Sequence, residues 1–159
     1  MSEPAPVRIG PNRELAVDGI VVGGLSTSVS DLDRSIGFYR ALGFAVGTPF
    51  DILPAYRPIL GMADGSMARA VYVKRDGVAL ELVETGSASP APPSGSFAAQ
   101  LGLTHIRLCV DSLPRVEALI QTCGGEVRDE ARVAANGMVY VYCTDPDGMR
   151  ILLSAPADG

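Results

Sequence analysis

The sequence contains no tryptophan, one histidine (His105) and three cysteines (Cys109, Cys123 and Cys143). An odd number of cysteines without two-residue spacing predicts neither a disulfide framework nor a zinc knuckle, so we expect free thiols in a reducing cytoplasm. Basic clusters are missing and the net charge is −5, which argues against nucleic acid as the partner. No membrane-spanning apolar run or signal peptide is recognisable. The expected partner is therefore a small molecule.

Hydrophobic residues make up 47% of the 159 positions, which is enough for one well-buried core and too little chain for two ordinary domains. We expect a flexible N-terminal arm over 1–17 and a first module over 18–85. A linker rich in Pro, Ser and Ala over 86–100 leads to a second module over 101–155. The two modules together form a single domain.

A short pattern occurs twice, because residues 24–46 align without a gap with residues 105–127 at an offset of 81 positions. Each copy predicts an alternating strand, a polar break, an amphipathic helix and a terminating glycine. The chain therefore looks like two copies of one supersecondary unit. Two such units facing each other make a cleft, and the paired positions Gly24 and His105 are expected to face into it.

The remaining elements follow from alternation and turn residues. Strands are predicted over 67–74, 78–83, 138–143 and 150–154, with a hairpin turn at Asp76 and Gly77. The Asp145 to Gly148 segment is expected to act as a turn rather than as a catalytic group. Residues 47–65 form a long connection with three prolines, which could be a lid over a site or a plain surface excursion.

Period-two alternation assigns polar side chains to the cleft. Leu80, Leu82, Ile151 and Leu153 are expected in the core, and the cleft side then receives Ser26, Ser28, Glu81, His105, Arg107, Arg150 and Leu152. Tyr140 and Tyr142 lie on a strand whose phase the sequence leaves open, so either could contact a substrate. The partly apolar lining favours an organic ligand over a bare polar anion.

Three of these residues predict the chemistry. His105 suits a general acid or base, although it could instead be a histidine satisfied by a backbone group. Glu81 lies between Ala79 and Val83, and apolar surroundings favour a proton-abstracting carboxyl group. Arg107 can bind a substrate carboxylate or enolate bidentately, although Glu81 could equally pair with Arg107 or His105.

Several motifs resemble a known family. The segment 29–35, Phe38, Tyr39, the segment 42–44 and the later segment 145–148 look like signatures of the vicinal oxygen chelate superfamily. Glyoxalase I, methylmalonyl-CoA epimerase, extradiol dioxygenases, fosfomycin resistance enzymes and bleomycin-binding proteins belong to it. The resemblance implies an α+β fold in which two tandem βαβββ modules form one cleft-bearing mixed sheet. It also implies a homodimer, with the cleft formed within one chain or across two.

The metal ligands of the family fall on Gly24, Glu81, His105 and Leu152 in this sequence. Gly24 and Leu152 offer no side-chain donor, and two ligands seldom retain a hard divalent ion. We therefore expect no cofactor, although Ser26 or a residue of the long connection could complete a divalent metal site.

The resemblance and the cleft residues together leave three functions open. The first is a metal-independent enzyme of lyase or isomerase type that moves protons on a small carbonyl-containing metabolite. Such chemistry gives isomerisation, epimerisation, cyclisation or elimination. The second is a binding or resistance protein that sequesters a metabolite or antibiotic. The third is a metal-dependent glyoxalase or dioxygenase-like enzyme with an altered ligand set.

Overall fold

A computed structural model describes residues 22–56, 58–63, 67–86 and 102–157 of the chain. The expected arm over 1–17 lies outside these residues, as does the expected linker except for Gly86. Among the described residues, no helix is long and apolar enough to cross a membrane.

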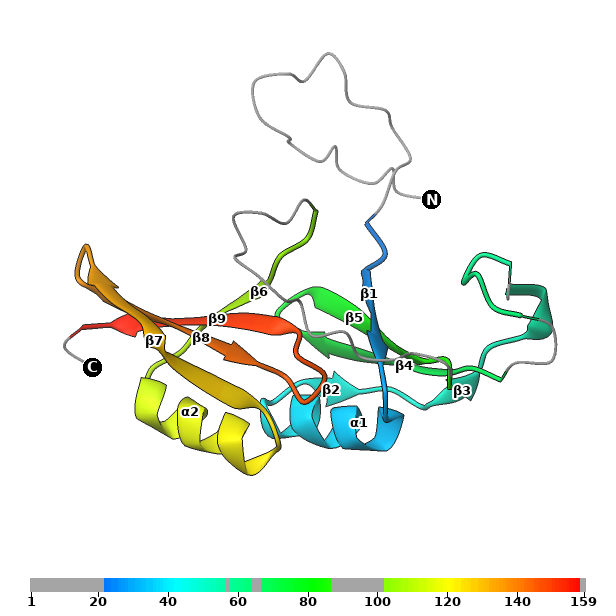
Figure 1. Cartoon of the computed structure of the whole chain (residues 1–159), viewed down its shortest axis with the longest axis horizontal. Helices are drawn as coiled ribbons and strands as arrows, with labels where there is room; N and C mark the ends of the chain where they lie inside the picture. Colours follow the sequence, from blue (N-terminus) through cyan, green and yellow to red (C-terminus); the bar gives the residue numbers. More distant parts are fainter. Residues whose placement is uncertain (1–21, 57, 64–66, 87–101, 158–159) are drawn as a thin grey trace, which may run out of the picture.

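The two halves of the chain carry the same order of elements, except that the first half has one additional short strand and a 3-10 turn (Figure 1). The first half consists of β1 (Leu25–Val29), α1 (Leu32–Ala41), β2 (Ala45–Val46), β3 (Phe50–Asp51), the 3-10 turn η2 (Pro54–Tyr56), β4 (Arg69–Arg75) and β5 (Val78–Glu84). The second half consists of β6 (Ile106–Cys109), α2 (Leu113–Thr122), β7 (Glu126–Ala135), β8 (Met138–Thr144) and β9 (Arg150–Pro156). The α+β class with two tandem modules is confirmed.

The strands form two sheets, so the expected single mixed sheet is divided between the modules. The first sheet has the order β1-β5-β4-β2, with β3 pairing to β4, and the second has the order β6-β9-β8-β7. In each sheet the first strand of the module pairs parallel with the last, and the other pairs are antiparallel.

The sequence repeat is a structural repeat. The helices begin at Leu32 and Leu113 and end at Ala41 and Thr122, so both ends keep the offset of 81 positions. Asp31 caps α1, because its carboxylate accepts a 2.9 Å hydrogen bond from the Arg34 backbone N–H. The second helix lacks such a side-chain cap.

Each helix covers one face of its sheet. Buried side chains of the four central strands pack toward the helices in one core cluster, and they are Val71, Val73, Leu80, Leu82, Val141, Cys143, Ile151 and Leu153. Both helices lie on the same side of the sheets (Figure 1). The helix-free faces therefore both turn to the opposite side. We call these two faces the open faces of the first and second sheet.

The predicted strands miss β7, the longest strand of the second sheet. Its sequence EVRDEARVAA is rich in charges, and most of its side chains are exposed. Charged residues are a common protection of an edge strand against pairing with other chains, and they hide the alternation that predicts strands. The connection over 47–65 also contains β3 and η2. Its function as a lid stays a prediction.

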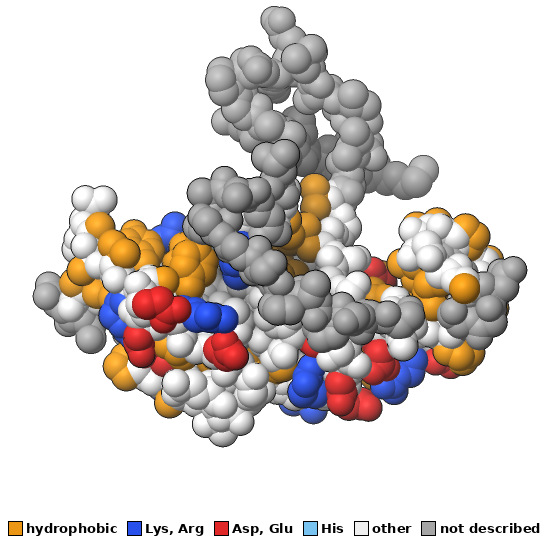
Figure 2. Space-filling model, viewed as in Figure 1, with side chains coloured by type: hydrophobic (Ala, Val, Ile, Leu, Met, Phe, Trp, Pro, Cys, Tyr) orange, Lys and Arg blue, Asp and Glu red, His pale blue; other side chains and the backbone are white. Residues whose placement is uncertain are grey.

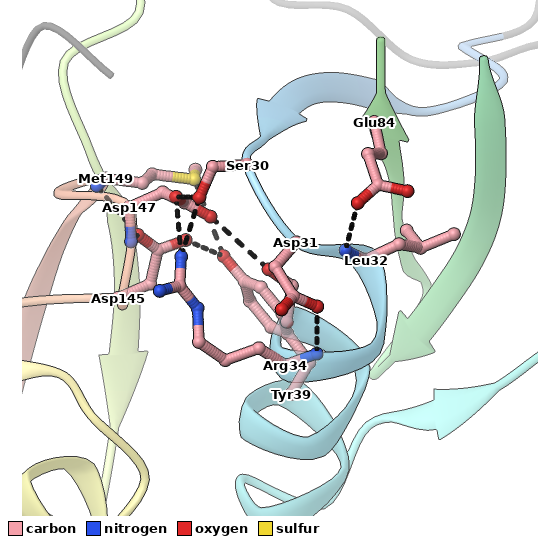
Figure 3. Close-up of polar contacts among 10 residues, drawn as sticks. Ser30, Asp31, Leu32, Arg34, Tyr39, Glu84, Asp145, Asp147 and Met149 are labelled. Carbon is pink, nitrogen blue, oxygen red and sulfur yellow. Dashed lines mark hydrogen bonds and ion pairs between the residues drawn. The ribbon is translucent and has the colours of Figure 1, made fainter. Parts of the chain in front are cut away.

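The halves are joined by the start of α1 and the turn between β8 and β9 (Figure 3). Tyr39 donates a 3.0 Å hydrogen bond to Asp145, and Arg34 forms a 2.8 Å ion pair with Asp147. The other carboxylate oxygen of Asp145 accepts hydrogen bonds from the backbone N–H groups of Asp147 and Met149. These contacts agree with the predicted turn role of Asp145.

Candidate functional site

The open face of the first sheet carries a carboxylate held by a hydroxyl. Strand register places Ser26 beside Glu81, and Tyr72 lies beside Glu81 on the other side. The Ser26 Oγ donates a hydrogen bond of 2.6 Å to Oε2 of Glu81. Ser28 lies two residues further along the same face, is exposed and pairs with Val83.

Tyr72 is a site residue that the sequence reasoning missed. The negative charge of Glu81 raises the pKa of Tyr72, with smaller contributions from burial and from hydrogen bonding to Glu81. The Phe50 ring stacks on Tyr72 with centroids 5.8 Å apart and an interplanar angle of 25°. The signal was present, because the two-residue turn at Asp76 and Gly77 sets the register that brings Tyr72 opposite Glu81.

The open face of the second sheet carries both tyrosines whose phase the sequence left open. The central strand here is β9, which pairs with β6 on one side and with β8 on the other. Leu152 of β9 therefore has Arg107 and Tyr142 as its neighbours across the sheet. Ser154 of β9 has Cys109 and Tyr140. Because Val141 and Cys143 are buried, Tyr140 and Tyr142 point to the other face. The structure therefore brings Tyr140, Tyr142, Leu152 and Arg107 together.

The Arg107 side chain is oriented by two neighbours. Its guanidinium lies 5.7 Å from the centre of the Tyr140 ring, within the range of a cation–π contact. Its Nε donates to Oγ of Ser154 at 3.4 Å, and that hydroxyl also lies 3.5 Å from Sγ of Cys109. Stacking and hydrogen bonding thus restrict the plane of the guanidinium.

His105 lies directly before β6, half-buried against Tyr142. Its Nδ1 is 3.0 Å from the Thr104 hydroxyl and 3.5 Å from the Tyr142 hydroxyl. The His105 and Tyr142 rings meet edge to face at 5.6 Å. Burial raises the pKa of Tyr142 and the nearby positive charge of Arg150 opposes that rise, which places Arg150 in the same cluster.

One alternative can be judged from these contacts. Glu81 and Arg107 form no ion pair with each other, and neither has an oppositely charged partner within 4.0 Å in the described part of the chain. An ion pair of Glu81 with Arg107 is therefore the wrong explanation of these two residues.

A metal ion would find few donors here. Within the ranges that the structure describes, no three His, Cys, Asp or Glu side chains are grouped closely enough to hold one. A Cβ atom at Gly24 would lie 3.0 Å from the Ala79 carbonyl oxygen, so a ligating side chain there would need a local shift. Leu152 is apolar. Of the four positions that the resemblance assigns to metal ligands, Glu81 and His105 carry side-chain donors.

A hollow of about 370 Å³ lies elsewhere, at the turn between β4 and β5. It is lined by Gly23 and residues 74–79. The predicted site residues do not line it, so it is a separate feature of the surface.

Comparison with known proteins supports the fold. Residues 22–153 match the family model of the Glyoxalase/Bleomycin resistance protein/Dioxygenase superfamily. No curated protein is significantly similar in sequence.

Solved structures of similar fold include a glyoxalase family protein from Bacillus cereus, with a TM-score of 0.72 and 15% identity over 89% of this chain and 99% of that one. The fosfomycin resistance protein FosX from Listeria monocytogenes has a TM-score of 0.58 and 14% identity over 89% and 96% of the two chains. A glyoxalase I mutant from Zea mays has a TM-score of 0.56 and 19% identity, covering 84% of this chain and 43% of that one. At these identities the likeness concerns the fold alone.

Proposed function

Because the chain belongs to the Glyoxalase/Bleomycin resistance protein/Dioxygenase superfamily, many of whose members are enzymes, we propose that it catalyses proton transfer on a small carbonyl-containing organic metabolite. The reaction would be an isomerisation, epimerisation, cyclisation or elimination. The observation that carries the proposal is the Glu81 carboxylate, which accepts a 2.6 Å hydrogen bond from Ser26 and has no cationic partner among the described residues.

Each residue has a role in this proposal. Glu81 removes a proton from the carbon beside the substrate carbonyl, and Ser26 orients the carboxylate through its hydrogen bond. His105 returns or removes the second proton. Arg107 stabilises the negative charge that develops on the enolate oxygen, because its guanidinium is already oriented by Tyr140 and Ser154. Arg150, Ser28 and Leu152 contact other parts of the substrate.

The proposed reaction is metal-independent. Its support is the donor set, since Glu81 and His105 are the two ligands that remain at the family's metal positions. Elemental analysis of protein purified without chelator tests this point. Stoichiometric metal that disappears in a Glu81→Gln variant would instead favour the metal-dependent alternative.

Deuterium exchange tests the proposed reaction without a known substrate. Small ketones and 2-oxo acids are incubated with the protein in D2O, and C–H exchange is followed by NMR. We expect exchange above the buffer rate for at least one compound, with a loss of about 10²-fold or more in Glu81→Gln. Glu130→Gln, at an exposed position on β7, is the matched control and should retain full activity. A rate of C–H exchange that is the same in Glu81→Gln as in the wild type would contradict the proposal.

A binding protein is the second candidate, favoured by the exposed stacked pair Phe50 and Tyr72 and by the aromatic rings of Tyr140 and Tyr142. Aromatic surfaces of this kind hold organic ligands without converting them. Sequestration would be supported by a saturable binding isotherm in which all of the ligand is recovered unchanged. The protein should then also show no deuterium exchange that depends on Glu81.

We also propose that the protein works in the cytoplasm as a homodimer. Cys109, Cys123 and Cys143 are all free thiols, as suits a reducing compartment. Hydrophobic side chains gather on the projecting lobe between β3 and β4 (Figure 2). Exposed fractions there reach 63% at Leu53 and 80% at Ile59, which favours coverage by a partner. Light scattering after size exclusion should give twice the chain mass, and a monomer would contradict the proposal.

A further inference from the structure

Lys74 is the only lysine among the 13 lysine and arginine residues of the chain, and it lines the hollow at the turn between β4 and β5. Strand register places Lys74 between Ala45 of β2 and Ala79 of β5. Neither neighbour across the sheet therefore offers a charge to the ammonium group. By contrast, Arg69 at the other end of β4 has Glu84 opposite it and forms an ion pair with it at 2.9 Å.

Two carboxylates lie near Lys74 in the strand register, and both already have partners. Asp76 lies 3.3 Å from Nε of Arg75, and Glu81 accepts the hydrogen bond from Ser26. In the described part of the chain, no carboxylate lies within 4.0 Å of the Lys74 ammonium. The charge of Lys74 is therefore left for an anion from solution.

Arg75 lines the same hollow, but its guanidinium is held by other groups. Its Nη1 donates to the backbone carbonyl oxygen of Leu42, directly after α1, and its Nε faces Asp76. The charge that the hollow offers to a ligand is therefore the compact ammonium of Lys74. An ammonium carries three donors around one point charge and suits a phosphate group, whereas the planar guanidinium fork is the better match for a carboxylate.

The hollow has room for more than a phosphate group. Gly23 and Gly77 contribute no side chains to its lining, and a Cβ atom at either position would meet nothing within 4 Å. Its volume of about 370 Å³ lies at the lower end of the range of small-molecule pockets, roughly 300–1,000 Å³. A phosphate with a short organic group attached is therefore of suitable size.

Lys74 and Ala79 lie on the open face of the first sheet, next to Tyr72 and Glu81. Lys74 follows Tyr72 by two residues on β4, and Ala79 precedes Glu81 by two residues on β5. At about 3.3 Å per residue, the two positions on each strand are roughly 7 Å apart. The negative charge of Glu81 then favours a ligand that directs its anionic end away from Glu81 and toward Lys74.

We propose that this hollow binds a small phosphomonoester whose phosphate group contacts the Lys74 ammonium. The site goes beyond the proposed proton transfer, since binding of the phosphate requires no catalytic group. A single exposed charge pair contributes little in water, so we expect a dissociation constant on the order of 1 mM. The affinity should decrease as the salt concentration increases.

Acetylation of the single lysine measures the occupancy of the hollow. The full chain is treated with N-hydroxysuccinimidyl acetate in an amine-free buffer of constant ionic strength, and mass spectrometry of its peptides follows Lys74 and the α-amino group separately. Glycerol 3-phosphate at about 10 mM should slow the acetylation of Lys74 about fivefold or more and leave the α-amino group unaffected. Glycerate should slow it by less than about twofold, and glycerol should have no effect.

Each other result of this experiment would overturn the proposal. Equal protection of Lys74 and the α-amino group would show that the phosphate compound acts on the reagent. Equal protection by glycerate would overturn the phosphate class, and protection by none of the three compounds would overturn the site.

Variants test the role of the lysine with a second measurement, the amide chemical shifts of Gly23 and Gly77 on addition of glycerol 3-phosphate. Lys74→Gln should abolish these shift changes, and Lys74→Arg should retain them in part. Ala45→Glu keeps the lysine but places a carboxylate opposite it, so affinity should fall about threefold or more. Arg115→Gln removes the same charge from an exposed position of α2 and is the matched control. Shift changes that persist in Lys74→Gln, or that disappear in Arg115→Gln, would overturn the proposal.

The site and the proposed catalytic function can fail separately. Glu81→Gln should bind glycerol 3-phosphate at least as tightly as the wild type, because a nearby negative charge is removed. Binding that is retained while deuterium exchange is absent keeps the phosphate site and overturns the catalytic function. Loss of phosphate binding in Glu81→Gln would show that Lys74 is not its principal contact and would overturn the proposed site.

Discussion

The Tyr39 hydroxyl donates a 3.0 Å hydrogen bond to Oδ2 of Asp145, which lies 106 residues further along the chain. Tyr39 is fully buried and Asp145 is 2% exposed, so neither group can turn to water instead. The bond links α1 of the first module to the β8–β9 turn of the second. It is therefore a direct polar connection between the two copies of the repeat.

Removing this hydroxyl should destabilise the protein. Tyr39→Phe keeps the ring packing but takes one donor from the buried Asp145 carboxylate, which costs about 1–3 kcal/mol. Urea denaturation followed by circular dichroism measures the change. Tyr56→Phe, at a 54% exposed position, should change stability by less than about 0.5 kcal/mol. Equal stabilities of the two variants would contradict the structural role of the bond.

Stability should also depend on the titration of Asp145. Burial is the main cause that raises the pKa of Asp145 above its ordinary value of 3.8, although hydrogen bonds from Met149, Tyr39 and Asp147 oppose it. The folded state then holds this proton more tightly than the unfolded state. The contribution of Asp145 is thus fully present below about pH 3.8 and declines as pH rises through the folded-state pKa.

Asp145→Asn isolates that contribution, because asparagine does not titrate. The stability of the wild type relative to this variant should fall as pH increases from 3.5 to about 7, measured by denaturation at each pH. A difference that stays constant with pH, or increases, would show that the pKa of Asp145 is not raised.

The charge of Glu81 should be visible in the titration of Tyr72. Glu81 is the largest cause of the raised pKa of Tyr72, so Glu81→Gln should shift that pKa toward 10.0. Tyrosinate absorbance, with Tyr72→Phe subtracted to assign the signal, measures the shift. Glu130→Gln should leave the titration unchanged, and an unchanged titration in Glu81→Gln would refute the contact.

The cysteines should react at very different rates with a disulfide reagent at pH 8. Burial, with a lesser contribution from the charge of Glu117, raises the pKa of the Cys143 thiol to about 11, whereas Cys109 is exposed. Cys109→Ser should therefore remove the fast phase of thiol labelling. Cys143→Ser should affect only the slow phase, and loss of the fast phase in that variant would contradict the structure.

Two glycines should respond oppositely to alanine. A Cβ atom at Gly125 would overlap the Thr144 backbone carbonyl oxygen and lie 2.7 Å from Ile120 and 3.0 Å from Phe38, so Gly125→Ala should destabilise by roughly 1–3 kcal/mol. A Cβ atom at Gly37 meets nothing within 4 Å, so Gly37→Ala in α1 should stabilise by about 0.5–1 kcal/mol. Thermal denaturation checks both, and stabilisation by Gly125→Ala would contradict the close packing between the modules.

Elements with clear periodicity were predictable, and elements governed by distant pairing were not. Both helices have apolar stripes, polar starts and terminating glycines, so their positions followed from local residues. The edge strand β7 and the short strands β2 and β3 lack such a pattern and exist because neighbouring strands pair with them.

The candidate site shows the same division. Glu81 and His105 could be named because titratable residues on alternating strands stand out. Tyr72 was missed, although the tight turn at Asp76 and Gly77 already implied its position beside Glu81.

The sequence by itself determined the tandem repeat, the helices, the main strands and which residues offer chemistry, since these depend on side-chain type and local spacing. Only the tertiary structure decided which face Tyr140 and Tyr142 occupy and how Asp145 meets Tyr39. Alternation divides a strand into two faces, but the helix that covers one of them decides which face stays open. Contacts between residues more than a hundred positions apart depend on how the modules pack, and no local pattern encodes that packing.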